Sequence, residues 1–250
     1  MQQPSQRRIP ALVVALLAAE AEPVFAQGYS VGGSRPSRAD KFKLHAELAA
    51  REDSSNVALP KLGLAWAANP KLELGVDFQL KHLDSGLERV SGLGDAEVKA
   101  KTLLLDADRN AAQINVSAEF KLALPLDDAR RGFGEGRPVI KLPVTASRRE
   151  GPWEFGGLIG VQHAFRGKRT SFSGGALITR ELDARVKIGT EIVTEWRTGR
   201  RRPDEVMANV GLRYAPSRKS EIFFIVGQSL ATWDRAPLRR LKAGIEIVLD

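Results

Sequence analysis

The chain has no cysteine, only three histidines and only 6% aromatic residues in 250 positions. Without cysteine there can be no disulfide, no thiolate metal site and no cysteine nucleophile. Three histidines also make a histidine-rich metal site a poor prediction. Hydrophobic residues make up 43% of the chain, which argues against a disordered chain and against a bundle of membrane helices. A single large β domain, which often reaches this length as one unit, remains compatible with these absences.

Long apolar runs are also missing, apart from one near the start of the chain. Ile9–Ala19 is an uncharged run of 11 residues, preceded by Arg7 and Arg8 and followed by Val24-Phe25-Ala26. The run is shorter than the ~20 residues that a membrane helix needs. A basic start, a short apolar stretch and a small residue at the end are typical of a secretory signal peptide. We therefore expect a signal peptide over 1–26 rather than a buried core helix, followed by a flexible segment over 27–40.

The formal charge of +8 predicts an anionic partner, whether nucleic acid, phospholipid or lipopolysaccharide. Export makes nucleic acid a poor candidate. We therefore expect outer-membrane lipid and lipopolysaccharide as partners, together with a small solute and the barrel-assembly machinery.

From about residue 41 to residue 250 the sequence alternates between apolar and polar residues. In one such segment Leu72, Leu74, Val76, Phe78 and Leu80 alternate with Glu73, Gly75, Asp77, Gln79 and Lys81. A period of two indicates the two faces of a β-strand. We expect twelve strands, centred near Leu44, Leu64, Val76, Val98, Val116, Leu142, Ile159, Leu177, Ile188, Val210, Phe224 and Ile245. The second and sixth are the weakest, because Pro60 and Pro143 each remove a ladder donor.

The connections between these segments fall into two classes. Those after odd-numbered strands are mostly long and polar, as in 125–137 and 197–205, although 166–169 is short. Those after even-numbered strands are short, as in 68–70 and 150–152. This sorting is typical of an outer-membrane barrel, with short periplasmic turns and longer outer loops. A soluble β-sandwich shows the same alternation but has no reason to sort its loops. We therefore predict an all-β fold, an antiparallel transmembrane β-barrel of about twelve strands over 41–250.

Two features bear on the membrane boundary. Five aromatic residues lie near the ends of the expected strands, where interfacial aromatics belong, although ordinary packing at strand ends explains them as well. They are Trp66, Trp153, Trp196, Tyr214 and Trp233. The last strand ends in Leu249-Asp250, without the final aromatic residue that such barrels usually carry.

The stretch Gly92-Leu93-Gly94-Asp95 resembles a Gly-Leu/Ile-Gly-Asp signature of bacterial outer-membrane proteins, the MetA-pathway phenol-degradation or transporter-like family. Residues 106–110 and 114–124 are similar to the turn and strand that follow the signature, and Phe120–Pro125 resembles the Lys-Leu-Pro end of that strand. Leu126-Asp127 stands where members often have Thr-Gly. The resemblance implies that the signature opens a strand of an exported β-barrel from a Gram-negative bacterium. It also implies passage of small compounds, including aromatic or hydrophobic ones.

The polar row of the strands predicts the residues that face the interior. Both signs of charge are interleaved, which is compatible with a solute-selecting path or with a barrel filled by paired side chains. The candidates are Asp77, Lys99, Lys101, Glu119, Lys121, Arg185, Lys187, Glu191, Arg213 and Glu246. A twelve-stranded barrel favours a narrow or plugged interior over a wide one.

Arginine and lysine are concentrated in the expected outer loops. Guanidinium groups bind phosphate well, so lipopolysaccharide phosphates are the predicted contact, with a merely solvated basic surface as the alternative. The residues are Arg130, Arg131, Lys168, Arg169, Arg200, Arg201 and Arg202.

An enzyme is the weaker hypothesis. Ser171 or Ser173 near His163 would be the pair to consider in a lipid-modifying enzyme, but no G-x-S-x-G motif supports it. We expect no catalytic residue, cofactor or metal, and predict a passive channel or transporter-like protein for small molecules. The alternatives are a lipid-modifying enzyme, a filled structural barrel and a soluble periplasmic β domain.

Overall fold

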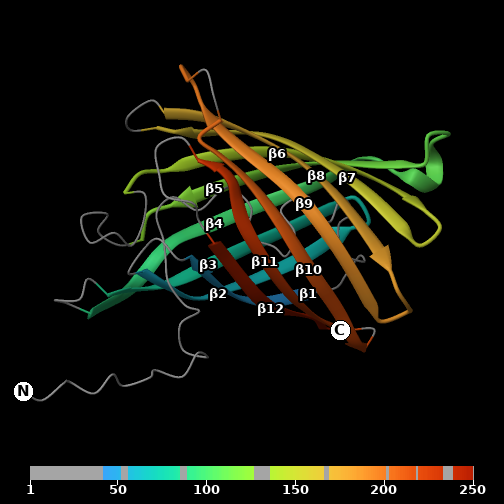
Figure 1. Ribbon diagram of the computed structural model, residues 1–250, viewed down its shortest axis with the longest axis horizontal. Helices are drawn as coiled ribbons and strands as arrows, with labels where there is room; N and C mark the ends of the chain where they lie inside the picture. The colour runs from blue at the N-terminus through green and yellow to red at the C-terminus, as the bar shows by residue number, and fades with distance from the viewer. Residues whose placement is uncertain are drawn as a thin grey trace, which may run out of the picture.

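The computed structural model describes residues 42–51, 56–84, 89–126, 136–165, 169–200, 203–217, 219–232 and 239–249. In these residues twelve antiparallel strands form one closed barrel (Figure 1). The strands are β1 (Phe42–Arg51), β2 (Asn56–Asn69), β3 (Leu72–Asp84), β4 (Arg89–Leu105), β5 (Ile114–Leu124), β6 (Val139–Glu150), β7 (Trp153–Ala164), β8 (Arg169–Glu181), β9 (Val186–Arg197), β10 (Glu205–Ser217), β11 (Ser220–Thr232) and β12 (Arg239–Leu249). A short 3₁₀ helix, η1 (Ala107–Arg109), joins β4 to β5. None of the described residues belongs to a helix that is long and apolar enough to cross a membrane.

Pairing of the first and last strands closes the barrel. Each strand pairs with its neighbours in sequence, and β1 pairs with β12 from Phe42↔Leu249 to Arg51↔Arg240. Closure leaves no strand edge with unpaired backbone groups, which is what a sheet in a lipid environment requires.

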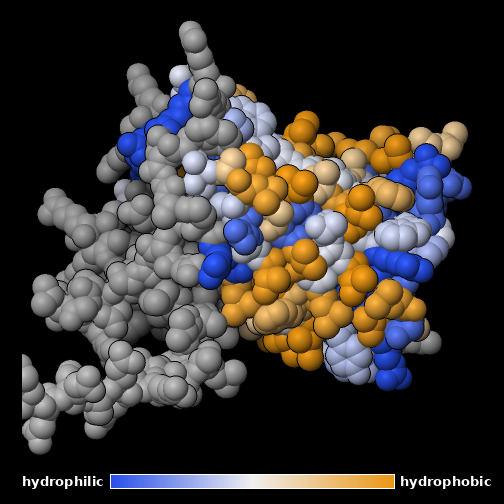
Figure 2. Space-filling view, viewed as in Figure 1, coloured by the Kyte–Doolittle hydropathy of each residue, from blue (hydrophilic) through white to orange (hydrophobic). Residues whose placement is uncertain are grey.

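The two faces of the strands differ sharply in exposure. On β2, Leu62, Leu64 and Trp66 are exposed, whereas Ala65 and Ala67, which point to the other face of the strand, are buried. The same pattern recurs around the barrel and reaches 68% exposure at Ile159 on β7. Figure 2 shows these outward apolar side chains as a belt beside a hydrophilic end on the right. A contiguous apolar surface of this extent faces lipid rather than water.

Aromatic side chains mark the ends of this belt. Phe42 stacks on Trp66 at one end, with ring centroids 6.4 Å apart. Phe172 stacks on Trp196 near the other end, with centroids 6.1 Å apart. Trp153, at the start of β7, and Tyr214, near the end of β10, are also exposed. Four of the five aromatic residues singled out in the sequence therefore lie at belt edges, and Trp233 is outside the described residues.

One end of the barrel, which we call the short-turn end, carries the connections after even-numbered strands. They are 70–71, 106–113, 151–152, 182–185 and residue 218, and the chain also enters β1 and leaves β12 there. The connection 106–113 is longer than the sequence suggested, because Asp106 caps η1 by accepting a hydrogen bond from the Asp108 amide, at 3.2 Å. The strand ends that the connections after odd-numbered strands join lie at the opposite end.

The prolines and the glycine signature coincide with irregular pairing. Pro60 lies where the β2–β3 register shifts between Ala58 and Lys61. Pro143 lies where the β5–β6 ladder is interrupted, because proline has no amide hydrogen to donate. Both segments are nevertheless strands. The Gly92–Asp95 signature does not open a strand, as the resemblance implied, since β4 already begins at Arg89 and the signature lies at a bulge against β3.

All twelve predicted strand centres fall inside the observed strands. The longest strand is β4, with 17 residues. Its bulge lets the strand continue past the glycines, which explains the early start. The expected signal peptide and the segment 27–40 lie outside the described residues.

Candidate functional site: the barrel interior

Seven charged side chains from β2–β6 form one cluster on the inward face, here called the lysine–carboxylate cluster. Its members are Lys61, Asp77, Glu97, Lys99, Glu119, Lys121 and Lys141. Lys61 lies 2.9 Å and Lys99 2.7 Å from Asp77, while Lys141 lies 2.7 Å from Glu97. Lys121 lies 3.3 Å from Glu119 and 4.0 Å from Glu97. Four cations thus share three carboxylates along one side of the barrel.

Strand register brings these residues together. Asp77 on β3 stands opposite Glu97 on β4, and Lys99 stands opposite Lys121 on β5. Gly75 pairs with Lys99, and a Cβ at Gly75 would lie 2.7 Å from Cε of that lysine. Glycine at this position therefore gives the lysine room to reach Asp77.

The cluster is shielded from water. Asp77 is 1% exposed and Lys99 is 4% exposed. A buried charge is tolerated only when it is paired and hydrogen-bonded, and the short contacts to Asp77 meet that condition. The pairs hold the long lysine side chains in the interior, where they form a polar wall.

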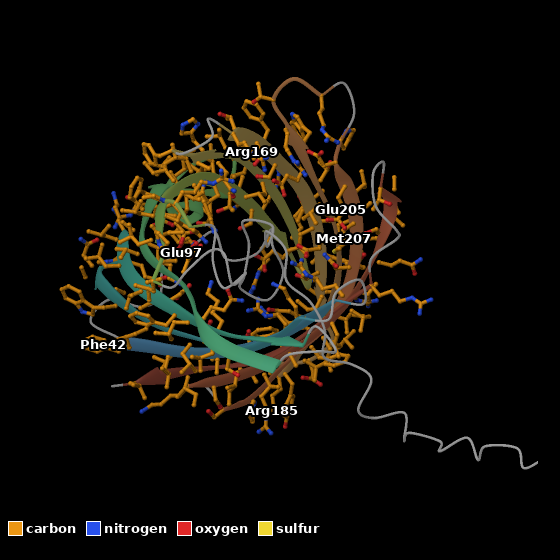
Figure 3. The ribbon with its side chains drawn as sticks, turned by 90° about the vertical axis from the view of Figure 1, so that its left-hand side faces the viewer. Phe42, Glu97, Arg169, Arg185, Glu205 and Met207 are labelled. Carbon is orange, nitrogen blue, oxygen red and sulfur yellow. The ribbon has the colours of Figure 1, made fainter. Side chains whose placement is uncertain are left out.

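The other side of the barrel also carries polar contacts. Asn209 on β10 donates a hydrogen bond to Glu191 on β9 at 2.8 Å, and Ser229 donates one to Glu205 at 2.6 Å. Figure 3, which looks along the barrel, shows Glu97 on one side of the ring and Glu205 and Met207 on the opposite side. The charged walls therefore face each other across the interior.

Apolar side chains also point inward, which the alternation did not predict. Leu158 on β7, Leu177 on β8, and Phe223 and Ile225 on β11 form one buried cluster, with Val193 on β9 packed against it. We call these five residues the inward apolar cluster. Because β7 and β11 are not neighbours in the sheet, the contact runs through the interior instead of along the wall. The interior is thus polar on one side and partly apolar on the other.

A cavity of about 550 Å³ opens at the short-turn end, beside β10, β11 and β12. Its lining includes Arg185, Lys219, Glu221 and Glu246, so both signs of charge are present. Arg213 contacts Glu221 at 2.5 Å next to it. The cavity is large enough for a small solute.

The structure places most of the expected interior residues on the inward face. Asp77, Lys99, Lys121 and Glu191 are buried. Lys101, Glu119, Lys187, Arg213 and Glu246 are half-buried on the same face. Arg185 instead lies in the exposed turn before β9, at the mouth of the cavity.

Sequence reasoning missed Lys61 and Lys141, although both alternate correctly with their apolar neighbours. They follow Pro60 and precede Pro143, in the two strands that were hardest to recognise. Counting the period of two through each proline would have found them. The inward apolar cluster left no such signal, because Ile222–Val226 is apolar on both faces.

Among the basic residues assigned to outer loops, Arg169 and Arg200 are described and exposed. Arg200 pairs with Asp204 at 3.1 Å. Arg130, Arg131, Lys168, Arg201 and Arg202 lie outside the described residues.

The serine and histidine pair considered for an enzyme is separated by the sheet. His163 points outward, where its Nδ1 lies 2.9 Å from the Thr170 hydroxyl and its ring contacts Phe165 edge to face. Ser171 and Ser173 are buried on the inward face. Histidine on one face cannot activate a serine on the other. Within the described ranges, no group of three histidine or acidic side chains is placed to hold a metal ion.

No family model matches the chain, and no curated protein matches it significantly. Among solved structures, the NanC porin aligns with a TM-score of 0.60 at 8% identity, over 82% of this chain and 98% of that one. The fold is that of a transmembrane β-barrel.

Two further similar barrels are an anion-selective porin from Comamonas acidovorans and a bacterial polysaccharide outer membrane secretin. The first has a TM-score of 0.43 at 8% identity and covers 83% of this chain and 98% of its own. The second has a TM-score of 0.47 at 7% identity and covers 85% of this chain and 99% of its own. At such identities a likeness concerns the barrel fold alone.

Proposed function

We propose that this β-barrel lies in the outer membrane of a Gram-negative bacterium and passes small molecules without an energy source. The observation that carries the proposal is the reversal of faces, with an apolar belt outside and charged pairs inside a closed barrel. A soluble domain would bury its apolar side chains and expose its charged ones. The short-turn end then faces the periplasm.

The path that we propose is narrow. The inward carboxylates and lysines are buried and paired, so they restrict the interior instead of lining a wide aqueous channel. A small solute would meet lysines on β2–β6 and the inward apolar cluster on the other side. This combination supports small aromatic or hydrophobic compounds, including aromatic carboxylates, as solutes. The resemblance to the MetA-pathway phenol-degradation family points in the same direction.

The test is conductance and uptake by the purified, refolded barrel in lipid bilayers. We expect small single-channel currents and faster uptake of benzoate than of a sugar of similar size into vesicles. Boiled protein is the control. Large currents without solute preference would contradict a narrow path, and neither current nor uptake would contradict the channel.

A filled structural barrel is the second candidate, and one observation favours it. The inward apolar cluster packs through the interior, and four of its five members are at most 6% exposed. An impermeable barrel that still fractionates with the outer membrane would decide for this candidate.

Export by the expected signal peptide and insertion by the assembly machinery complete the proposal. Contact of the basic outer loops with lipopolysaccharide also belongs to it, and the exposed Arg169 is the residue among them with which to begin. Fractionation of cells, followed by gel migration with and without boiling, tests the location.

A further inference from the structure

An arginine lies on the outward face at the short-turn end, where the apolar belt stops. The guanidinium carbon of Arg180 on β8 lies 5.1 Å from the ring centroid of Trp153 on β7. The two residues are direct cross-strand partners, and Trp153 in turn pairs with Glu150 on β6. Both side chains are exposed. This cation–π contact holds the guanidinium group of Arg180 beside the indole ring of Trp153.

The next row toward the middle of the belt is apolar. Phe155 on β7 pairs with Ile178 on β8, and each is 42% exposed. Arg148 on β6 is the cross-strand partner of Phe155 and therefore lies beside this apolar pair. The polar row of Trp153 and Arg180 therefore adjoins the apolar row within one residue pair. A phospholipid has the same order, with its charged headgroup next to its apolar acyl chains.

The local charge is positive. Arg148 lies 2.9 Å from Glu150, so that pair is neutral. Arg180 has no carboxylate within 4.0 Å among the described residues, and its recorded contact is the ring of Trp153. A guanidinium at the edge of a lipid-facing surface is stabilised by an anion at the same depth.

We infer that Arg148, Trp153 and Arg180, here called the arginine–tryptophan patch, bind the phosphate of an anionic phospholipid. Arg180 donates to two phosphate oxygens, and Arg148, whose charge is offset by Glu150, adds a second guanidinium donor. The acyl chains lie along Phe155 and Ile178. The lipid is a phospholipid of the leaflet at the short-turn end, because the patch is continuous with the apolar belt there. The inference rests on the proposed membrane position but not on the channel.

The experiment uses the full chain, refolded in detergent and checked for a heat-dependent gel shift. Phosphatidylglycerol and diacylglycerol with the same acyl chains are added, and bound lipid is counted by native mass spectrometry. We expect phosphatidylglycerol to be retained in preference to diacylglycerol. Arg180→Gln should weaken phosphatidylglycerol retention about tenfold, the size of a charged hydrogen bond, and leave diacylglycerol unchanged.

The matched control is Arg109→Gln, since Arg109 is also exposed at the short-turn end but lies in η1, away from the patch. It should retain phosphatidylglycerol as the parent does. Equal retention of the two lipids, an equal loss in both variants, or displacement of the lipid by inorganic phosphate would overturn the inference. If Arg180→Gln does not refold, Arg180→Lys and Trp153→Leu replace it, and each should show a partial loss. Lipid retention without conductance would contradict the channel alone.

Discussion

At the scale of single residues, glycines on the inward face decide which side chains fit beside them. Gly227 on β11 pairs with Asn209 on β10, and a Cβ at Gly227 would overlap the amide oxygen of that asparagine. The same asparagine donates to Glu191. Glycine is therefore required there for space, although its backbone is ordinary strand.

Gly227→Ala should lower the stability of the barrel by about 1–3 kcal/mol, because Asn209 must move and its hydrogen bond to Glu191 is lost. The measurement is urea unfolding followed by tryptophan fluorescence. Gly157→Ala is the control, since a Cβ at Gly157 meets nothing within 4 Å. Equal effects in the two variants would show that strand glycine itself, and not the contact, sets the stability.

Asp77 is the residue on which the lysine–carboxylate cluster depends most. Asp77→Asn removes the negative charge that Lys61 and Lys99 share. We expect the free energy of unfolding to fall by about 3–5 kcal/mol, because both buried cations lose this carboxylate. Glu150→Gln breaks only the exposed pair with Arg148 and should cost below about 1 kcal/mol. Urea midpoints compare the two. An unchanged midpoint in Asp77→Asn would mean that water, not the carboxylate, solvates the lysines.

At the scale of the element, β11 illustrates how far sequence reasoning reaches. Alternation identified the strand and its centre, but Ile222–Val226 contains no polar residue to mark the inward face. Register with β10 and β12 makes the choice, and it turns Phe223 inward and Phe224 outward. Strands with a polar contrast, such as β3 and β5, had their faces predicted because Asp77 and Lys121 mark them.

Phe223→Ala should destabilise the barrel by about 3–5 kcal/mol, since the ring is 6% exposed and packs on Leu177 and Leu158. Phe224→Ala changes the same residue type on the opposite face, where lipid or detergent fills the space, and should cost less. Urea unfolding of both variants is the measurement. In a conducting barrel, Phe223→Ala should also raise the single-channel current. A larger loss in Phe224→Ala would contradict the assignment of faces.

At the scale of the whole molecule, the pairing of β1 with β12 makes the barrel closed. These strands lie at the two ends of the described chain, and nothing local in either of them selects the other as its partner. Closure follows because each neighbouring pair is rotated in the same sense, so the sheet curves back on itself.

The absence of cysteine allows a direct test of this closure. Ala46 and Ile245 are cross-strand partners, at a separation that suits a disulfide. Ala46→Cys with Ile245→Cys should oxidise in the folded barrel and change the migration of boiled, unreduced protein. Ala46→Cys with Ile222→Cys is the control, since Ile222 is one strand farther away and should not cross-link. A cross-link in the control alone would exclude the observed register.

Alternation along the chain was enough to predict the strands, their number, most of the turns and most of the polar inward row, because a period of two is a local property. It also predicted an apolar outer face without telling lipid from a protein core, since both require the same alternation. The pairing of β1 with β12, the sharing of Asp77 by Lys61 and Lys99, and the inward apolar cluster are evident only in the folded barrel. These features depend on register and curvature, which bring together side chains that are far apart in the chain and that no local pattern connects.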